Sequence, residues 1–169
     1  FEHERAEVVV HNIYTTQRDF VSSFKGINGA PEWSPDGQQL ALVLSKDGSP
    51  DIYVMDLGSR SLRRITSTPA IETEPSFSPD GQTLFFTSDR GGKPQVYSAN
   101  LASGAQQRVT HTGIYNASPS LTRDGKSMIM LHRDNSGFKI ARLDMASDKI
   151  TVLTETSLDE SPTVAPNGR

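Results

Sequence analysis

A four-residue turn motif recurs at a nearly constant interval, and this repetition limits the possible folds more than any other feature of the sequence. The first copy is Ser34-Pro35-Asp36-Gly37, and Ser78-Pro79-Asp80-Gly81 follows 44 residues later. Related tetrapeptides begin another 44 residues on, at Thr122, and 43 residues after that, at Ala165. A period of roughly 40–50 residues is typical of repeat architectures, in which each repeat is one supersecondary unit.

Each repeat follows one pattern of short strands and turns. A proline and a large apolar residue precede the turn motif, and an unbroken apolar run such as 40–44 follows it. Short apolar runs between turn residues are typical of strands that are buried on both faces. A polar loop, a third strand such as 52–57, a second turn and a short polar strand such as 63–66 complete the repeat.

The turn motif itself has the chemistry of a tight hairpin. Proline fixes φ, aspartate accepts hydrogen bonds from the local backbone, and glycine adopts the positive φ that closes the turn. Each repeat is therefore predicted to be a sheet of four short antiparallel strands. Stacked sheets that bury both faces against their neighbours form a β-propeller, so the predicted fold class is all-β.

The register of the repeats predicts how many blades the chain holds. It gives an incoming half blade at 8–24, whole blades at 31–66, 75–110 and 119–154, and the start of a further blade at 162–169. Propellers usually carry about 4–8 blades. We therefore expect the chain to be a fragment of a longer protein that supplies the missing blades. The alternative is that the two end pieces meet and complete one blade.

Composition and motifs argue against several functional classes. The net charge of −3 is not the basic excess of a nucleic-acid binder, and no apolar run approaches the roughly 18 residues of a membrane span. The sequence has no cysteine and no Gly-x-Ser-x-Gly nucleophile elbow. Its four histidines fall at unrelated blade positions, so we expect no metal cluster. The acid of each turn motif is explained by turn chemistry.

The loops that lead into the proline of each repeat are the candidate functional sites. In a propeller these loops connect the outermost strand of one blade with the innermost strand of the next, close to the central channel. Polar and mostly acidic side chains of several repeats would then meet on one rim, where a protein or peptide could dock. The alternative is that these are simply solvated loops. The polar residues expected on this rim are Asn28, Glu74, Asn116, Asp159 and Glu160.

The blade pattern resembles that of TolB-type propellers. It is carried by Pro-x-Trp-Ser-Pro-Asp-Gly-x-x-Leu-Ala at 31–41, by the third strand at 52–57 and by Arg-Arg-Ile-Thr at 63–66. Propellers of prolyl-oligopeptidase-like peptidases share this pattern. Longer stretches at 28–57, 73–97 and 158–168 resemble the TolB family more closely.

The resemblance implies a periplasmic bacterial protein with an N-terminal α/β domain and a C-terminal six-bladed propeller. Such proteins belong to the Tol-Pal system, which maintains outer-membrane integrity and supports cell division. The resemblance further implies a noncatalytic propeller that binds the Pal lipoprotein and nuclease colicin segments. TolA would be contacted only through the N-terminal domain, outside this chain. No cofactor is implied, apart from a calcium ion that the family can hold in the channel.

The family's Pal-contacting positions fall on the rim loops. Ala30 and Thr73 match positions whose alteration is expected to weaken Pal binding, and Asn28, Glu74, Asp159 and Glu160 match neighbouring positions. The sequence departs from the family at Ile27, where a histidine is expected, so the Pal contact there is expected to differ.

Two other functions are compatible with the repeat pattern. One is a substrate-gating propeller of a prolyl-oligopeptidase-like serine peptidase, whose hydrolase domain would lie elsewhere in the protein. The other is a ring-shaped enzyme such as a lactonase, which needs inward-facing carboxylates around a metal.

Overall fold

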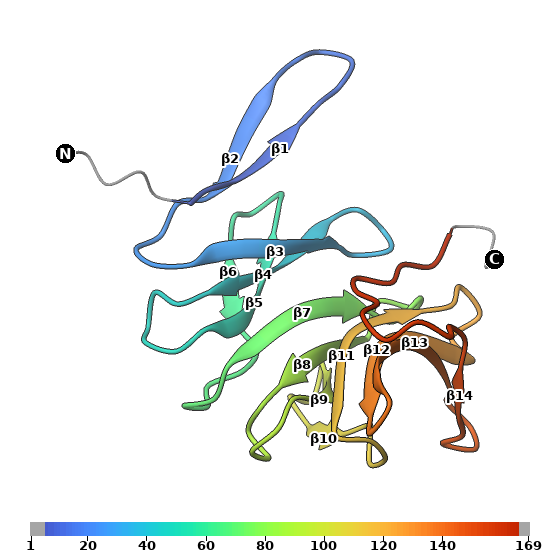
Figure 1. Ribbon diagram of the computed structural model, residues 1–169. Helices are drawn as coiled ribbons and strands as arrows, with labels where there is room; N and C mark the ends of the chain where they lie inside the picture. The colour runs from blue at the N-terminus through green and yellow to red at the C-terminus, as the bar shows by residue number, and fades with distance from the viewer. Residues whose placement is uncertain (1–5, 166–169) are drawn as a thin grey trace.

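The computed structural model describes residues 6–165, which fold into 14 β-strands without a helix (Figure 1). The strands form one two-stranded hairpin and three four-stranded antiparallel sheets. The hairpin is β1 (Val8–His11) and β2 (Arg18–Ser22); the first sheet is β3 (Asn28–Trp33), β4 (Gln39–Leu44), β5 (Asp51–Asp56) and β6 (Leu62–Arg64); the second is β7 (Glu72–Phe77), β8 (Thr83–Ser88), β9 (Gln95–Asn100) and β10 (Gln106–Arg108); the third is β11 (Tyr115–Leu121), β12 (Ser127–Asp134), β13 (Gly137–Asp144) and β14 (Ile150–Val152). The all-β fold and the four-stranded blades predicted from the repeats are confirmed.

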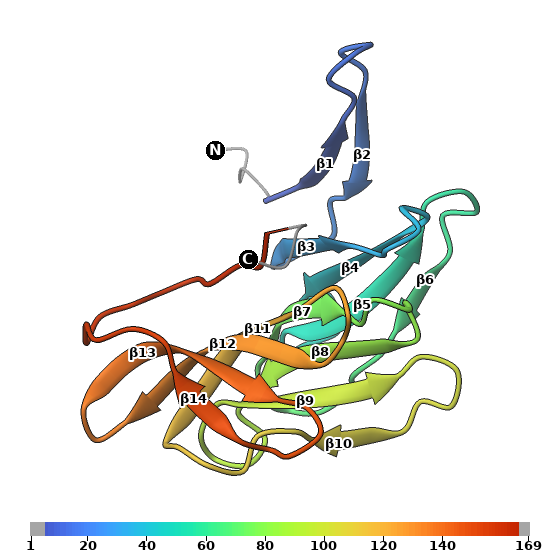
Figure 2. The same cartoon turned by 90° about the vertical axis from the view of Figure 1, so that its right-hand side faces the viewer.

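The strands of each sheet are hydrogen-bonded in chain order, so each blade is a meander. Each blade's first strand contacts that of the next blade, β3 with β7 and β7 with β11, and the β1–β2 hairpin stands beside the first blade (Figures 1 and 2). A cavity of about 200 Å³ is lined by four inner segments, which are β3, β7, β11 and residues 162–165. Its lining includes Glu32, Ser76, Ser120 and Thr163. The inner segments therefore surround a common space, as the walls of a propeller channel do.

The core lies between the sheets and depends on alternation within each apolar run. Leu40, Leu42 and Leu44 pack in one cluster with Val8 and Val21 of the hairpin. The intervening Ala41 and Val43 pack in a second cluster, with Leu84 and Phe86 of the next blade. Because consecutive side chains of a strand point to opposite faces, one unbroken run supplies both interfaces.

The same alternation joins the second and third blades. Phe85 faces away from Phe86 and packs in a third cluster with Val96, Met128 and Met130. Each four-stranded sheet thus has apolar contacts with its neighbour in the row, and these contacts hold successive blades together.

The turn motif has the predicted structure. Gly37 has φ 70°, and the Asp36 carboxylate accepts hydrogen bonds from Ser34 Oγ at 2.6 Å and from the Gln38 N–H at 3.0 Å. These hydrogen bonds, of which the one from Ser34 has the larger effect, lower the pKa of Asp36. Equivalent hydrogen bonds lower the pKa values of Asp80 and Asp124. The acid of the motif is therefore occupied by turn formation.

Residues 162–165 form no strand, and residues 166–169 lie outside the described range, so the further blade expected at 162–169 stays a prediction. Among residues 6–165 there is no helix with the length and apolar character needed to cross a membrane.

Candidate functional site

The segments that join one blade to the next lie at the start of each inner strand, at the opposite end from the turn motifs. We call them the rim segments and define them as 23–30, 65–74, 109–118 and 153–161. They contain all seven residues proposed from the sequence as binding residues: Asn28, Ala30, Thr73, Glu74, Asn116, Asp159 and Glu160. Their side chains differ widely in exposure, and this difference separates residues that shape the rim from residues that a partner can reach.

Asn28 and Asn116 shape the rim from inside. Asn28 is buried, accepts a hydrogen bond from the Phe24 N–H at 2.9 Å and donates to the Phe24 carbonyl at 2.6 Å. Asn116 is fully buried and donates to Gln95 Oε1 at 2.7 Å and to the Thr112 carbonyl at 2.8 Å. Both were expected among the polar side chains of the rim. The structure places them beneath it, where they fold each loop back onto its strand.

A buried histidine supports the loop that contains Asn116. His132 Nδ1 lies 2.7 Å from Asn116 Oδ1. Because the amide nitrogen of Asn116 donates elsewhere, its oxygen accepts from a neutral imidazole protonated on Nδ1. Burial lowers the pKa of His132, which favours this neutral form.

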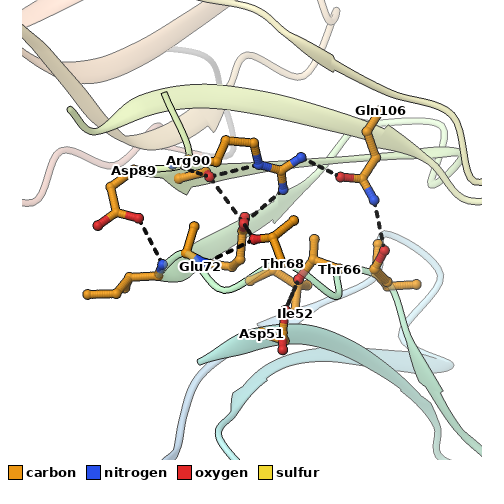
Figure 3. A network of polar contacts seen from close by, with 12 residues as sticks. Asp51, Ile52, Thr66, Thr68, Glu72, Asp89, Arg90 and Gln106 are labelled. Atoms are coloured by element: carbon orange, nitrogen blue, oxygen red, sulfur yellow. Dashed lines mark hydrogen bonds and ion pairs between the residues drawn. The ribbon is translucent and has the colours of Figure 1, made fainter. Parts of the chain in front are cut away.

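Glu72 is a buried rim residue that was not singled out from the sequence (Figure 3). Its fully buried carboxylate accepts hydrogen bonds from Thr68 Oγ1 at 2.6 Å and Ser88 Oγ at 3.1 Å. Arg90 Nη2 lies 2.9 Å from Glu72 Oε1, and Arg90 Nη1 donates to Gln106 Oε1 at 2.7 Å. Glu72 stands 44 residues after Asn28 and 44 before Asn116, so aligning the repeats would have revealed it.

A second feature of the rim is strained backbone at one register position. Ala30, Glu74, Ser118 and Ser161 have φ values of 45°, 53°, 52° and 48°, and each directly precedes a proline. A β-bulge interrupts the pairing of β3, β7 and β11 at this point. Left-handed residues other than glycine cost about 1–2 kcal/mol each, and such strain gathers at functional sites.

Glu74 connects two neighbouring blades at these bulges. Its carboxylate accepts hydrogen bonds from the Ser118 N–H at 2.9 Å, from Ser118 Oγ at 2.7 Å and from Thr87 Oγ1 at 2.6 Å. Glu74 and Thr73 are half-buried, whereas Ala30 is exposed. Of the residues proposed from the sequence, the exposed Ala30 and Glu160 and the half-buried Thr73 are accessible to a partner.

An apolar side chain recurs one position before each polar residue of this register, of which Asn28, Glu72 and Asn116 are buried and Asp159 is half-buried. Ile27 is 50% exposed, Ile71 is 53% exposed and Leu158 is 84% exposed, and the half-buried Tyr115 occupies the same register position. Of these residues, only Ile27 was singled out from the sequence, as a departure from the family pattern. Apolar residues exposed together and bordered by polar ones mark interaction surfaces.

A pocket of about 310 Å³ opens on the rim between the third blade and the C-terminal segment. It brings together Glu74, Asp159 and Glu160 but none of the other proposed residues. Its lining is Glu74, Tyr115, Ser118, Leu131, Phe138, Leu158, Asp159, Glu160 and Ser161. The Tyr115 and Phe138 rings meet edge to face at 5.3 Å between centroids. The rim therefore has a concave part as well as exposed loops.

A calcium ion in the channel would require several oxygen ligands. Within residues 6–165, no three His, Asp or Glu side chains are grouped so that they could hold a metal ion.

Comparison with protein families and curated proteins gives consistent matches. The family model described as "PD40: TolB beta propeller domain" matches residues 1–169. The chain is 57% identical over 169 residues to the Tol-Pal system protein TolB of Ruthia magnifica subsp. Calyptogena magnifica, a match that covers 99% of this chain and 40% of that protein. The chain thus spans about two fifths of the length of this relative.

Solved structures show the same likeness. The crystal structure of TolB from Acinetobacter baumannii matches with a TM-score of 0.91 and 43% identity, over 99% of this chain and 42% of that one. A structure from a study of two prolyl endopeptidases matches with a TM-score of 0.66 and 16% identity, over 92% of this chain and 27% of that one. At such low identity the second match shows a shared fold alone.

Proposed function

This chain belongs to the TolB β-propeller family of the Tol-Pal system, and we propose that its rim segments dock the lipoprotein Pal. The observation that carries the proposal is the repeated rim itself. Successive blades each bring a strained bulge and an apolar residue to one end of the sheets, with Ala30 exposed and Thr73 half-buried among them. Loops held on a rigid scaffold commonly carry binding functions.

The wider role follows from family membership and from the same rim. The chain spans about two fifths of its relative, so the whole protein's location and partners belong to the proposal. We propose a periplasmic protein that supports outer-membrane integrity and cell division through Pal, with nuclease colicin segments competing for the same surface. TolA would bind a domain outside these residues.

We also propose that this propeller acts by binding rather than by catalysis. The acids of the turn motifs are held in local hydrogen bonds, and the buried Glu72 is paired with Arg90 within the second blade. The likeness to prolyl endopeptidases extends only to the fold, and no residue described above favours the peptidase hypothesis.

Two rim substitutions test the docking surface. In the full-length protein, Ala30→Arg and Thr73→Arg are each expected to raise the Kd for Pal at least tenfold, a loss of about 1.4 kcal/mol, because a long charged side chain would separate the two surfaces. Isothermal titration with purified Pal measures the change. The matched control is Gln38→Arg, an exposed position in a turn motif at the opposite end of the sheets, which is expected to leave the Kd unchanged. Wild-type affinity for Pal in both rim variants would show that Pal does not dock on this surface.

A further inference from the structure

The rim pocket is lined by apolar side chains and by carboxylates. Tyr115, Leu131, Phe138 and Leu158 supply apolar surface, and the pocket volume of about 310 Å³ lies at the small end of ligand sites. Leu158, at 84% exposed, is the most exposed apolar side chain of the pocket lining. A pocket of this size suits one long side chain of a docked protein better than a whole small molecule.

The polar walls of the pocket determine which side chain fits. Three carboxylates line it, from Glu74, Asp159 and Glu160, and its lining includes no lysine or arginine. Glu74 accepts hydrogen bonds from Ser118 and Thr87, and Asp159 accepts them from Thr154 and Thr156. These hydrogen-bond donors are neutral and orient the carboxylates, and among charged side chains Lys139 acts on Asp159.

Asp159 stays ionised at neutral pH. The hydrogen bonds from Thr154 and then Thr156 lower its pKa below the ordinary value. Apolar side chains and carboxylates that line one pocket match a side chain that has an aliphatic stem and a cationic end. The Phe138 ring also attracts cations, and the Arg133 guanidinium lies 5.0 Å from its centroid, so a docked cationic end would meet the carboxylates and not this ring.

We propose that this pocket is an anchoring subsite for one lysine or arginine side chain of the protein that docks on the rim. The stem would lie against Leu131, Phe138 and Leu158, and the charged end would meet Glu74 and Glu160. The identity of the docking protein rests on the proposed function, but the chemistry of the pocket does not. The subsite can therefore be tested without Pal.

The first test uses two small probes on the full-length protein, acetyl-arginine amide and its uncharged analogue acetyl-citrulline amide. The arginine probe is expected to shift the methyl NMR signals of Leu131 and Leu158 at least threefold more than the citrulline probe at equal concentration. Glu160→Gln is expected to reduce this preference, whereas the matched control Glu155→Gln, an exposed glutamate outside the pocket lining, leaves it intact. Equal shifts by both probes, or none, would overturn the subsite.

The second test separates this inference from the proposed function. The double variant Leu158→Ser with Glu160→Gln is expected to raise the Kd for Pal about tenfold and to weaken its dependence on salt, since a screened charge contact is lost. If Pal binds the double variant with wild-type affinity and the probes show no preference, the subsite is wrong while Pal docking stands. If wild type fails to bind Pal but prefers the arginine probe, Pal docking is wrong while the subsite stands.

Discussion

Replacing Glu72 by alanine is expected to lower the free energy of unfolding by about 3–5 kcal/mol, the usual cost of removing one partner from a buried ion pair. Arg90, whose side chain is 20% exposed, lies 2.9 Å from the Glu72 carboxylate and would lose its counter-charge. The hydroxyls of Thr68 and Ser88 would also lose their acceptor. Glu72, Ser88 and Arg90 belong to the second blade and Thr68 to the rim segment that leads into it (Figure 3), so the loss falls on the attachment of this rim segment to its blade.

Denaturant titration of the full-length protein, monitored at the unfolding transition of the propeller, measures this loss. Glu72→Gln keeps an acceptor for the hydroxyls but not the charge, and is expected to lose less than Glu72→Ala. The control Glu155→Ala removes an exposed glutamate and is expected to change stability by less than about 0.5 kcal/mol. If Glu72→Ala were as stable as this control, the buried pair would contribute nothing to the stability of the second blade.

Replacing Phe86 by alanine is expected to cost about 3–5 kcal/mol, the range for truncating a buried phenylalanine. Phe86 is fully buried and belongs to the apolar cluster that joins the first and second blades. Its ring stacks on Tyr97 at 6.3 Å between centroids, and the Arg90 guanidinium lies 5.4 Å from its centroid. Alanine would leave a cavity between two sheets whose backbones are fixed by their ladders, so little collapse can fill it.

The same titration checks this expectation with Phe86→Leu as the matched variant. Leucine keeps most of the apolar contact, so its loss is expected to be clearly smaller than that of alanine. A loss below about 1 kcal/mol for Phe86→Ala would contradict tight packing between these blades.

The fold could be predicted from sequence because the repeat places strong local signals in register. The run at 40–44 is apolar throughout since both faces of β4 are covered, and Gly37 marks the turn that positions it. The third strand expected at 52–57 is observed as β5 (Asp51–Asp56). Strand ends shift by a residue because hydrogen bonding, rather than the apolar pattern, defines them.

The candidate site could be predicted only in part, because its contacts join distant residues. Asn116 was expected to be exposed, since nothing local shows that Gln95 and His132 surround its amide. The left-handed backbone of Ala30 runs against expectation, because a residue before proline is normally extended. The bond from Ser118 to Glu74 spans 44 residues and crosses between blades, so no local pattern reports it.

Two features could have been found with the sequence alone. Ile71, Tyr115 and Leu158 share the register of Ile27, and Glu72 shares that of Asn28. Aligning the rim segments position by position would have shown a recurring apolar residue followed by a polar one. What the alignment cannot show is that Asn28 and Glu72 are buried while Ile27 and Ile71 are exposed, the reverse of the usual preference.

Amide hydrogen exchange of the full-length protein, with and without Pal, tests most directly whether the rim segments are the docking surface. Pal is expected to slow exchange in the rim segments 23–30 and 65–74, which contain Ala30 and Thr73. Exchange in the turn motifs at 34–37 and 78–81, at the opposite end of the sheets, is expected to stay unchanged. Protection confined to the turn motifs, or no protection in the rim segments while Pal is bound, would contradict docking on the rim.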